Sequence, residues 1–232
     1  MATETQKPGV PTLHHMNNSQ SQRVLWLVEE LGIDYKLDLH FRDTKTQRAP
    51  AELKTIHPMG KAPVLVTADG RAIAETSAIM TYLLRTYDTE GKFESKDWVL
   101  DEQLTSFAGA TLGPSSTLEL LFEIMVRVTP WPLRFIPRAI HGQIQKGFTA
   151  PEFKLSLTYL EGILGDQQWF NGDAPGRGDF MLSWPLDMMG ERNWVAFDKD
   201  YPKLAAWRTR IQERDAWKQG LTKGNGYDLT IW

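Results

Sequence analysis

The stretch from His57 to Ser77 contains the residues whose types and spacing are best suited to bind a ligand. A turn rich in Pro and Gly leads Ala62-Pro63 into a short apolar strand, where proline costs no ladder hydrogen bond. Because X-Pro is the kind of peptide bond that tolerates the cis form, Ala62 could turn its backbone N–H and C=O outward toward an extended, peptide-like ligand. A second strand leads to Thr76 and Ser77, which favour a helix N-terminus whose N–H groups would receive a carboxylate. These parts together predict a small peptide-binding cleft.

The chain of 232 residues contains no cysteine, which excludes disulfides, cysteine metal sites and a thiol nucleophile. Any thiol chemistry must therefore use a thiol that the ligand supplies. A formal net charge of −3 gives no support to nucleic-acid binding, and no apolar run approaches the ~18–20 residues of a membrane span. Residues 1–11 lack the apolar core of a signal peptide, so we expect a cytoplasmic protein. The histidines show no ligand spacing, and we expect no metal site.

The elements that must position this cleft can be predicted from the spacing of the apolar residues. Thr12–Met16 is predicted to be a first strand, and helical spacing follows as far as Gly32, a typical residue just beyond a helix end. Apolar and polar residues then alternate from Ile33 to Phe41, which indicates a second strand. With the hairpin around Asp69-Gly70 and the helix after it, residues 11–87 are predicted to form a compact α/β domain.

Residues 97–232 are predicted to form a second, all-helical domain after a polar link at Asp88–Lys96. Residues 97–127 have helical spacing, and we expect Gly113-Pro114 to kink or break this helix. Three prolines should then enforce a non-helical crossing; they are Pro130, Pro132 and Pro137. Further helical patterns cover residues 138–147, 151–165, 179–190 and 202–214.

An α/β unit with a peptide cleft, followed by an all-helical half, resembles the cytosolic glutathione transferases from about Thr12 to Lys218. The most specific motif is Pro58-x-Gly60-Lys61-x-Pro63-x-Leu65 with Glu75-Thr76, which is similar to the family's glutathione-binding strand, turn and helix. Four further segments resemble a fungal and bacterial, yeast-like branch: Asn18 to Arg23, Arg48 to Leu53 with His57-Pro58, Asp179 to Leu186, and Tyr201 to Trp207. The resemblance implies a thioredoxin-like N-terminal domain, an all-α C-terminal domain and a homodimer.

The resemblance also implies roles for individual residues. The Ala62-Pro63 pair, with its bond in the cis form, would bring the Ala62 backbone against the cysteinyl part of glutathione. Glu75 and Thr76 would hold the γ-glutamyl amino and carboxylate groups, and Lys61 and Arg48 would lie near the glycyl carboxylate. Simpler readings stay open, because the proline could be an ordinary turn residue and the two cations ordinary surface residues.

The same resemblance implies that Ser19 stabilises the thiolate. Related enzymes use a tyrosine in the first strand or a serine at the entry of the first helix, and no tyrosine occurs before Tyr35. Ser19 lies four residues before Arg23, which matches the serine type. A hydroxyl beside a helix N-terminus can donate to a bound thiolate and lower the thiol pKa from about 8.5 toward neutral. Ser19 could instead be a simple helix cap, and Ser21 and Asn18 are alternative donors.

A pocket for a second substrate is expected between the end of the first strand and the long helix. By the resemblance its candidate residues are His15, Phe107, Thr111 and Trp232, each of which could instead be a core or dimer contact. His14 and His15 are neighbours in a strand, so one should face the core and the other the solvent. Asp179 is expected to be a folding residue: family members carry Ser or Thr where this chain has Gly176, which leaves only half of a capping box.

We therefore expect a glutathione transferase that conjugates the glutathione thiolate to hydrophobic electrophiles, with peroxide reduction by the same thiolate as a further activity. Glutathione would be the co-substrate, hydrophobic small molecules the second ligand, and no nucleic acid would be bound. The alternative is a non-catalytic, ligandin-like carrier that keeps the glutathione cleft and carries hydrophobic molecules with little turnover.

Overall fold

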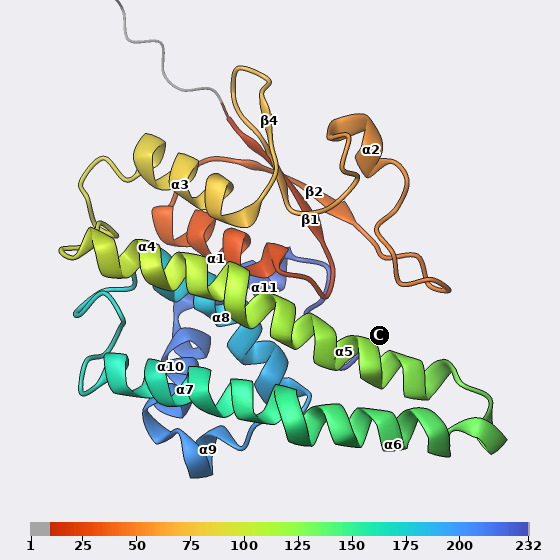
Figure 1. Ribbon diagram of the computed structural model, residues 1–232. Helices are drawn as coiled ribbons and strands as arrows, with labels where there is room; N and C mark the ends of the chain where they lie inside the picture. Colours follow the sequence, from red (N-terminus) through yellow and green to blue (C-terminus); the bar gives the residue numbers. More distant parts are fainter. Residues whose placement is uncertain (1–9, 232) are drawn as a thin grey trace, which may run out of the picture. The chain divides into compact units, whose positions relative to one another are not determined.

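The computed structural model describes residues 10–231, and the chain divides into two units (Figure 1). The first unit contains the residues up to Lys92 together with Glu213–Asp228, and the second contains Phe93–Gln212 and the residues from Leu229 onward. The first boundary falls within the predicted polar link. The grouping of Glu213–Asp228 with the first unit differs from the expectation that residues 97–232 form one helical domain.

The first unit is built on a four-stranded sheet with the strand order β2-β1-β3-β4. Strand β1 pairs parallel to β2 and antiparallel to β3, and β3 pairs antiparallel to β4. The elements of this unit are β1 (Thr12–Met16), α1 (Ser21–Leu31), β2 (Lys36–His40), α2 (Leu53–Ile56), β3 (Val64–Val66), β4 (Ala72–Ile73), α3 (Thr76–Tyr87) and α11 (Asp215–Lys223). Helices α1 and α3 pack against each other (Figure 1). The arrangement confirms the predicted thioredoxin-like α/β fold.

Helix α1 ends as predicted and is covered more completely than its amphipathic pattern suggested. Gly32 follows it in a left-handed conformation with φ +60°, which glycine adopts without steric cost. Helix α11, far away in the sequence, packs on α1 through an edge-to-face contact of Trp217 with Trp26, whose ring centroids are 5.7 Å apart. Because α11 covers a second side of α1, even the polar Gln22 and Arg23 are buried.

The second unit is helical throughout its regular elements. They are α4 (Trp98–Phe107), η1 (Ala108–Leu112), α5 (Gly113–Val128), η2 (Trp131–Leu133), α6 (Phe135–Ile144), η3 (Gln145–Thr149), α7 (Ala150–Leu164), α8 (Arg177–Glu191), α9 (Phe197–Asp200) and α10 (Pro202–Glu213). These elements confirm the predicted all-helical second half. Within residues 10–231, none of the helices combines the length and the apolar character that crossing a membrane would require.

One of two proline predictions needs correction. The long α-helix is interrupted where predicted, because a π-helical turn, η1, separates α4 from α5 directly before Gly113-Pro114, and Pro114 lies in the first turn of α5. Pro137 does not belong to a non-helical crossing, because it lies in the first turn of α6. Pro137 is tolerated because the first N–H groups of a helix have no intrahelical acceptor to lose. Pro114 directly follows the π-helical turn, where the regular i→i−4 bonding is already interrupted.

Candidate functional site

The turn before β3 has the backbone geometry that the sequence predicts. The Ala62–Pro63 peptide bond is cis, as expected. Gly60 adopts φ +57°, and its N–H donates to the carbonyl of His57 at 2.8 Å, which closes the turn. Ala62 and Pro63 are buried, whereas Lys61 is exposed. The turn therefore holds Ala62 fixed and leaves the neighbouring lysine free to meet a charged ligand.

A small apolar cluster fixes where this turn lies in the first unit. Ala62 packs with Met16, the last residue of β1, and with Leu53 of α2. Ala49 packs on the edge of the same cluster, and its neighbour Arg48 is exposed. The cluster thus brings three predicted parts of the site together: the end of β1, the loop that carries Arg48, and the turn with Ala62.

The start of α3 provides the second half of the predicted cleft. Glu75, immediately before the helix, is exposed and adopts φ +68° and ψ +118°, a conformation that L-residues rarely take. Such a backbone costs of the order of 1–3 kcal/mol and is typical of ligand-binding sites. No side chain caps the N-terminus of α3, which begins at Thr76. A helix N-terminus with free N–H groups and a positive partial charge is suited to receive a carboxylate.

The turn before α1 lies beside the start of α3. The Thr76 hydroxyl donates to Gln20 Oε1 at 3.4 Å, and the Arg23 guanidinium donates to the same oxygen. Sequence reasoning missed Gln20, because a single polar residue at a helix entry carries no recognisable signal. This contact places the predicted thiolate-stabilising residues, Asn18 and Ser19, in the same neighbourhood as Thr76.

The hydroxyl of Ser19 is fully engaged with its own turn. It donates to the carbonyl of Met16 at 2.8 Å, accepts from the Ser21 N–H at 3.1 Å, and lies 2.8 Å from the Ser21 hydroxyl. The Ser19 side chain is buried, with 3% of the residue exposed. In this arrangement the Ser19 side chain accepts from the first N–H of α1, whose N-cap residue is Gln20. A bound thiolate would have to displace the Met16 carbonyl to receive the proton.

Asn18 offers a donor that the turn does not use. Its backbone is left-handed, with φ +49°, a conformation that asparagine tolerates better than most residues. Its side-chain oxygen accepts from the Asp228 N–H at 2.7 Å, which fixes the orientation of the amide. Within residues 10–231, the Asn18 Nδ2 group has no hydrogen-bond partner. An amide held by its oxygen in this way keeps both N–H bonds available to a ligand.

A C-terminal segment, Gly224–Asp228, holds this turn in place, and we call it the C-terminal strap. The Asn18 N–H donates to the Gly226 carbonyl at 3.0 Å. The Asn225 Nδ2 group donates to the carbonyl of His40 at 2.7 Å, which ties the strap to the end of β2. Sequence reasoning also missed the strap, because its contacts join residues about 200 positions apart, and a Gly-rich tail is not specific.

The two neighbouring histidines are both buried, which corrects the expectation that one faces solvent. Only 7% of His14 and 1% of His15 are exposed, so side chains on both faces of β1 are covered. His14 Nδ1 lies 3.1 Å from His40 Nε2, and burial lowers the pKa of His14. The ring nitrogens of His15 have no hydrogen-bond partner among the described residues, and burial lowers its pKa to about 4. His15 is therefore a neutral core residue of the first unit.

The predicted second-substrate residues lie in different units. His15 belongs to the first unit, and Phe107 and Thr111 belong to the second. Phe107, the last residue of α4, contacts the ring of Tyr159 with centroids 5.6 Å apart, and Thr111 lies four residues further on in η1. Trp232 lies outside the described residues. The pocket itself stays a prediction. Among residues 10–231, no group of acidic or histidine side chains is arranged to hold a metal ion.

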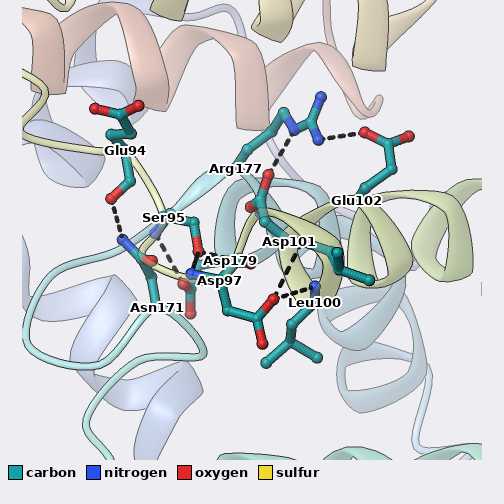
Figure 2. A network of polar contacts seen from close by, with 12 residues as sticks. Glu94, Ser95, Asp97, Leu100, Asp101, Glu102, Asn171, Arg177 and Asp179 are labelled. Atoms are coloured by element: carbon teal, nitrogen blue, oxygen red, sulfur yellow. Dashed lines mark hydrogen bonds and ion pairs between the residues drawn. The ribbon is translucent and has the colours of Figure 1, made fainter.

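Asp179 organises a polar network inside the second unit (Figure 2). The carboxylate accepts from the N–H groups of Phe170 and Gly176 at 3.0 and 2.9 Å, and from the indole of Trp207 at 2.7 Å. Burial raises the pKa of Asp179 to about 6. Arg177, two residues before Asp179, forms an ion pair with Asp101 at 2.9 Å (Figure 2). Asp179 is thus engaged in folding contacts, as the sequence analysis expects.

Comparisons with known proteins agree with this geometry. The model of the glutathione S-transferase N-terminal domain matches residues 19–86, and that of the C-terminal domain matches residues 145–215. The chain is 27% identical to glutathione S-transferase 1 of Saccharomyces cerevisiae over 91% of this chain and 94% of that protein. It is also 27% identical to glutathione S-transferase 3 of Schizosaccharomyces pombe, over 95% of this chain and 90% of that protein.

Solved structures agree as well. A glutathione S-transferase from Actinobacillus pleuropneumoniae is 31% identical, with a TM-score of 0.71 over 96% of this chain and 97% of the other. A glutathione transferase from Phanerochaete chrysosporium, solved with oxidized glutathione, shares the fold at 21% identity, with a TM-score of 0.73 over 95% of this chain and 96% of the other. With both domain models matched in order around a cis-proline turn and an uncapped helix start, this chain belongs to the glutathione S-transferase family.

Proposed function

We propose that this glutathione transferase conjugates the thiolate of glutathione to hydrophobic electrophiles, and that it reduces peroxides with the same thiolate. The observation that carries the proposal is the pairing of two backbone features in one unit: the cis Ala62–Pro63 turn and the uncapped start of α3 behind Glu75. An extended tripeptide with charged groups at both ends complements these features, and because the chain has no cysteine, the thiol must come from the ligand.

The proposed contacts of glutathione follow from this geometry. The Ala62 backbone pairs with the cysteinyl part, and Glu75 and Thr76 hold the γ-glutamyl amino and carboxylate groups. Arg48 and Lys61 lie near the glycyl carboxylate. Both cations are exposed, and neither forms an ion pair within the described part of the chain, so each is available to an anionic ligand.

The proposed chemistry is electrostatic stabilisation of the thiolate, followed by its oriented attack. Hydrogen-bond donors at the entry of α1 lower the thiol pKa, and the fixed thiolate then meets an electrophile at high effective concentration. Ser19 is the donor that the sequence predicts. The free Nδ2 group of Asn18 supports this residue as the donor if Ser19 keeps its bond to the Met16 carbonyl.

The comparisons do not favour the alternative of a non-catalytic carrier, since the two yeast relatives are named as transferases. We further propose a homodimer in the cytoplasm with a role in detoxification. Hydrophobic second substrates fit this role, because a hydrophobic electrophile is cleared most readily once a charged tripeptide is attached to it.

The test is glutathione conjugation to a panel of electrophiles, with glutathione affinity measured in parallel. The variants are Ser19→Ala, Asn18→Ala and Glu75→Ala, with Glu90→Ala, at an exposed position, as the matched control. Losing one hydrogen bond to a charged group should weaken glutathione binding about 10- to 150-fold in Glu75→Ala. Whichever of Ser19→Ala and Asn18→Ala loses turnover while keeping its affinity for glutathione identifies the thiolate-stabilising residue. Tight binding by the parent without turnover on any electrophile would instead establish a carrier.

A further inference from the structure

One stretch of the second unit carries positive charge without any acidic residue. Between Glu123 and Glu152 there is no Asp or Glu, whereas the cations Arg127, Arg134, Arg138 and Lys146 all fall in this interval. The whole chain has a net charge of −3, so this concentration of cations is local. It coincides with the hairpin in which η2 joins α5 to α6 (Figure 1).

The same hairpin exposes large apolar side chains. Trp131, at the turn, is 82% exposed, and Val128 and Phe135 on either side are 70% and 67% exposed. Leu133, Ile136 and Ile140 are exposed as well. We call the following residues the hairpin tip: Arg127, Val128, Trp131, Leu133, Arg134, Phe135, Ile136, Arg138 and Ile140. Single exposed apolar residues are ordinary, but a cluster of this size on one turn is typical of an interaction surface.

The acidic residues nearest to the tip are directed into the unit. Glu119 is 1% exposed and accepts hydrogen bonds from His141 at 2.8 Å and Thr149 at 2.6 Å. Glu123 pairs with Arg192 at 2.7 Å. These carboxylates therefore do not offset the cations of the tip, which form no ion pair within the described residues.

Side-chain hydrogen bonds also hold the backbone of the hairpin tip in place. Arg134 donates from Nε to the Thr129 carbonyl at 2.8 Å and from Nη2 to the Arg127 carbonyl at 3.1 Å. These bonds fix the turn between the two helices, so the apolar side chains are presented by a rigid element. A preformed surface loses little conformational entropy when it binds.

We propose that the hairpin tip docks on the surface of an anionic lipid bilayer. Aromatic and aliphatic side chains flanked by arginines are the composition that inserts at a membrane interface, where cations meet acidic headgroups. A second copy of the chain fits less well, because a symmetric contact would bring the arginines of both tips together. Nucleic acid fits less well too, since most of the apolar residues are aliphatic and cannot stack on bases.

Co-sedimentation of the full chain with vesicles tests the proposal. The probe is phosphatidylcholine vesicles that contain phosphatidylserine, compared with vesicles of phosphatidylcholine alone. Each cation near an anionic surface contributes about fivefold in affinity, so Arg127→Glu/Arg138→Glu should weaken binding at least about 25-fold. Trp131→Ser/Phe135→Ser should weaken it as well. The matched control, Lys154→Glu/Leu155→Ser, changes an exposed cation and an exposed apolar residue outside the tip and should bind like the parent.

Binding that requires phosphatidylserine, weakens with salt and is lost in both tip variants but retained in the control supports the proposal. Equal partition of the parent into both kinds of vesicle overturns it, and so does unchanged binding in the charge-reversal variant. Sedimentation velocity of the same proteins distinguishes membrane binding from self-association through the tip. A parent that binds no vesicle, but loses an oligomer when Trp131 and Phe135 are replaced, shows that the tip is instead an interface between copies.

Discussion

Replacing Asp179 by Asn tests how the second unit is held together. The residue is 0% exposed, and its Oδ1 atom accepts from both Phe170 N–H and Trp207 Nε1–H, while Oδ2 accepts from Gly176 N–H. An asparagine that keeps its oxygen at the first position directs an NH₂ group toward the Gly176 N–H. One buried donor then loses its acceptor, which should lower the free energy of unfolding by about 1–3 kcal/mol.

This cost should depend on pH in a defined direction. Burial raises the pKa of Asp179 from 3.8 in the unfolded chain to about 6. Since the folded pKa is the higher of the two, the folded state binds more protons between these values, and stability falls as the pH rises through them. From about pH 5 to about pH 8 the parent should lose about 1 kcal/mol through this carboxyl group. The Asn variant has no such titration, so the difference between the two proteins should shrink by that amount.

Equilibrium urea unfolding at both pH values, followed by circular dichroism, measures this difference. Asp173→Asn is the matched control, because Asp173 is an exposed carboxylate close by in the sequence. The stability of the variant must be compared with that of the parent at each pH. In the parent alone, the titration of His15 changes stability in the opposite direction and masks the effect of Asp179. An equal loss of stability at both pH values, or a larger loss at pH 8, would contradict the reasoning.

Three further predictions concern the same two units. Gly176→Ser restores the residue usual in the family but should destabilise this chain by about 1–3 kcal/mol, because a Cβ there would lie 2.8 Å from the Asn171 Cβ. Thermal unfolding should show that the double variant Gly176→Ser/Asn171→Gly recovers the lost stability. Burial lowers the pKa of His15 from 6.5 to about 4, so the unfolded chain binds the proton first, and the free energy of unfolding of the parent should fall by about 2 kcal/mol from about pH 8 to about pH 5. His15→Gln should remove this fall. Urea unfolding in which parent and variant lose equal stability would refute the prediction. Asn225→Ala removes the 2.7 Å hydrogen bond to the His40 carbonyl and should lower kcat, while the free energy of unfolding changes by about 1 kcal/mol or less. An unchanged kcat would show that the C-terminal strap does not position the turn before α1.

The parts of the fold that the sequence predicts depend on local backbone chemistry. Gly32 ends α1 in a left-handed conformation that glycine adopts without steric cost, and the cis proline stands where a turn meets a strand. Such signals lie within a few residues of the feature they specify. The same holds for Thr76, whose position after a strand marks the start of α3. Local rules therefore predict most of the backbone features that make up the proposed glutathione cleft.

The parts that the sequence does not predict depend on contacts between distant residues. His14 is buried because residues outside β1, such as His40, lie against it, and nothing within β1 reveals that packing. The packing of α11 on α1 and the strap over Asn18 join segments about 200 residues apart. Gly176 shows the same limit: its missing side chain looks like a defect in the capping box until Asn171 is seen to occupy the space.

The binding and the chemistry of this site are therefore specified by different means. The proposed cleft is made largely from backbone: the Ala62 turn, the rare conformation of Glu75 and the N–H groups of α3. Many side chains can surround such a frame, so a short motif is enough to predict it. The proposed thiolate donor is instead a single side chain in the turn before α1, where the Ser19 hydroxyl is already satisfied and the Asn18 amide is oriented from the C-terminal strap. Since the strap lies at the other end of the sequence, the acidity of the bound thiol should respond to changes there that leave glutathione affinity intact.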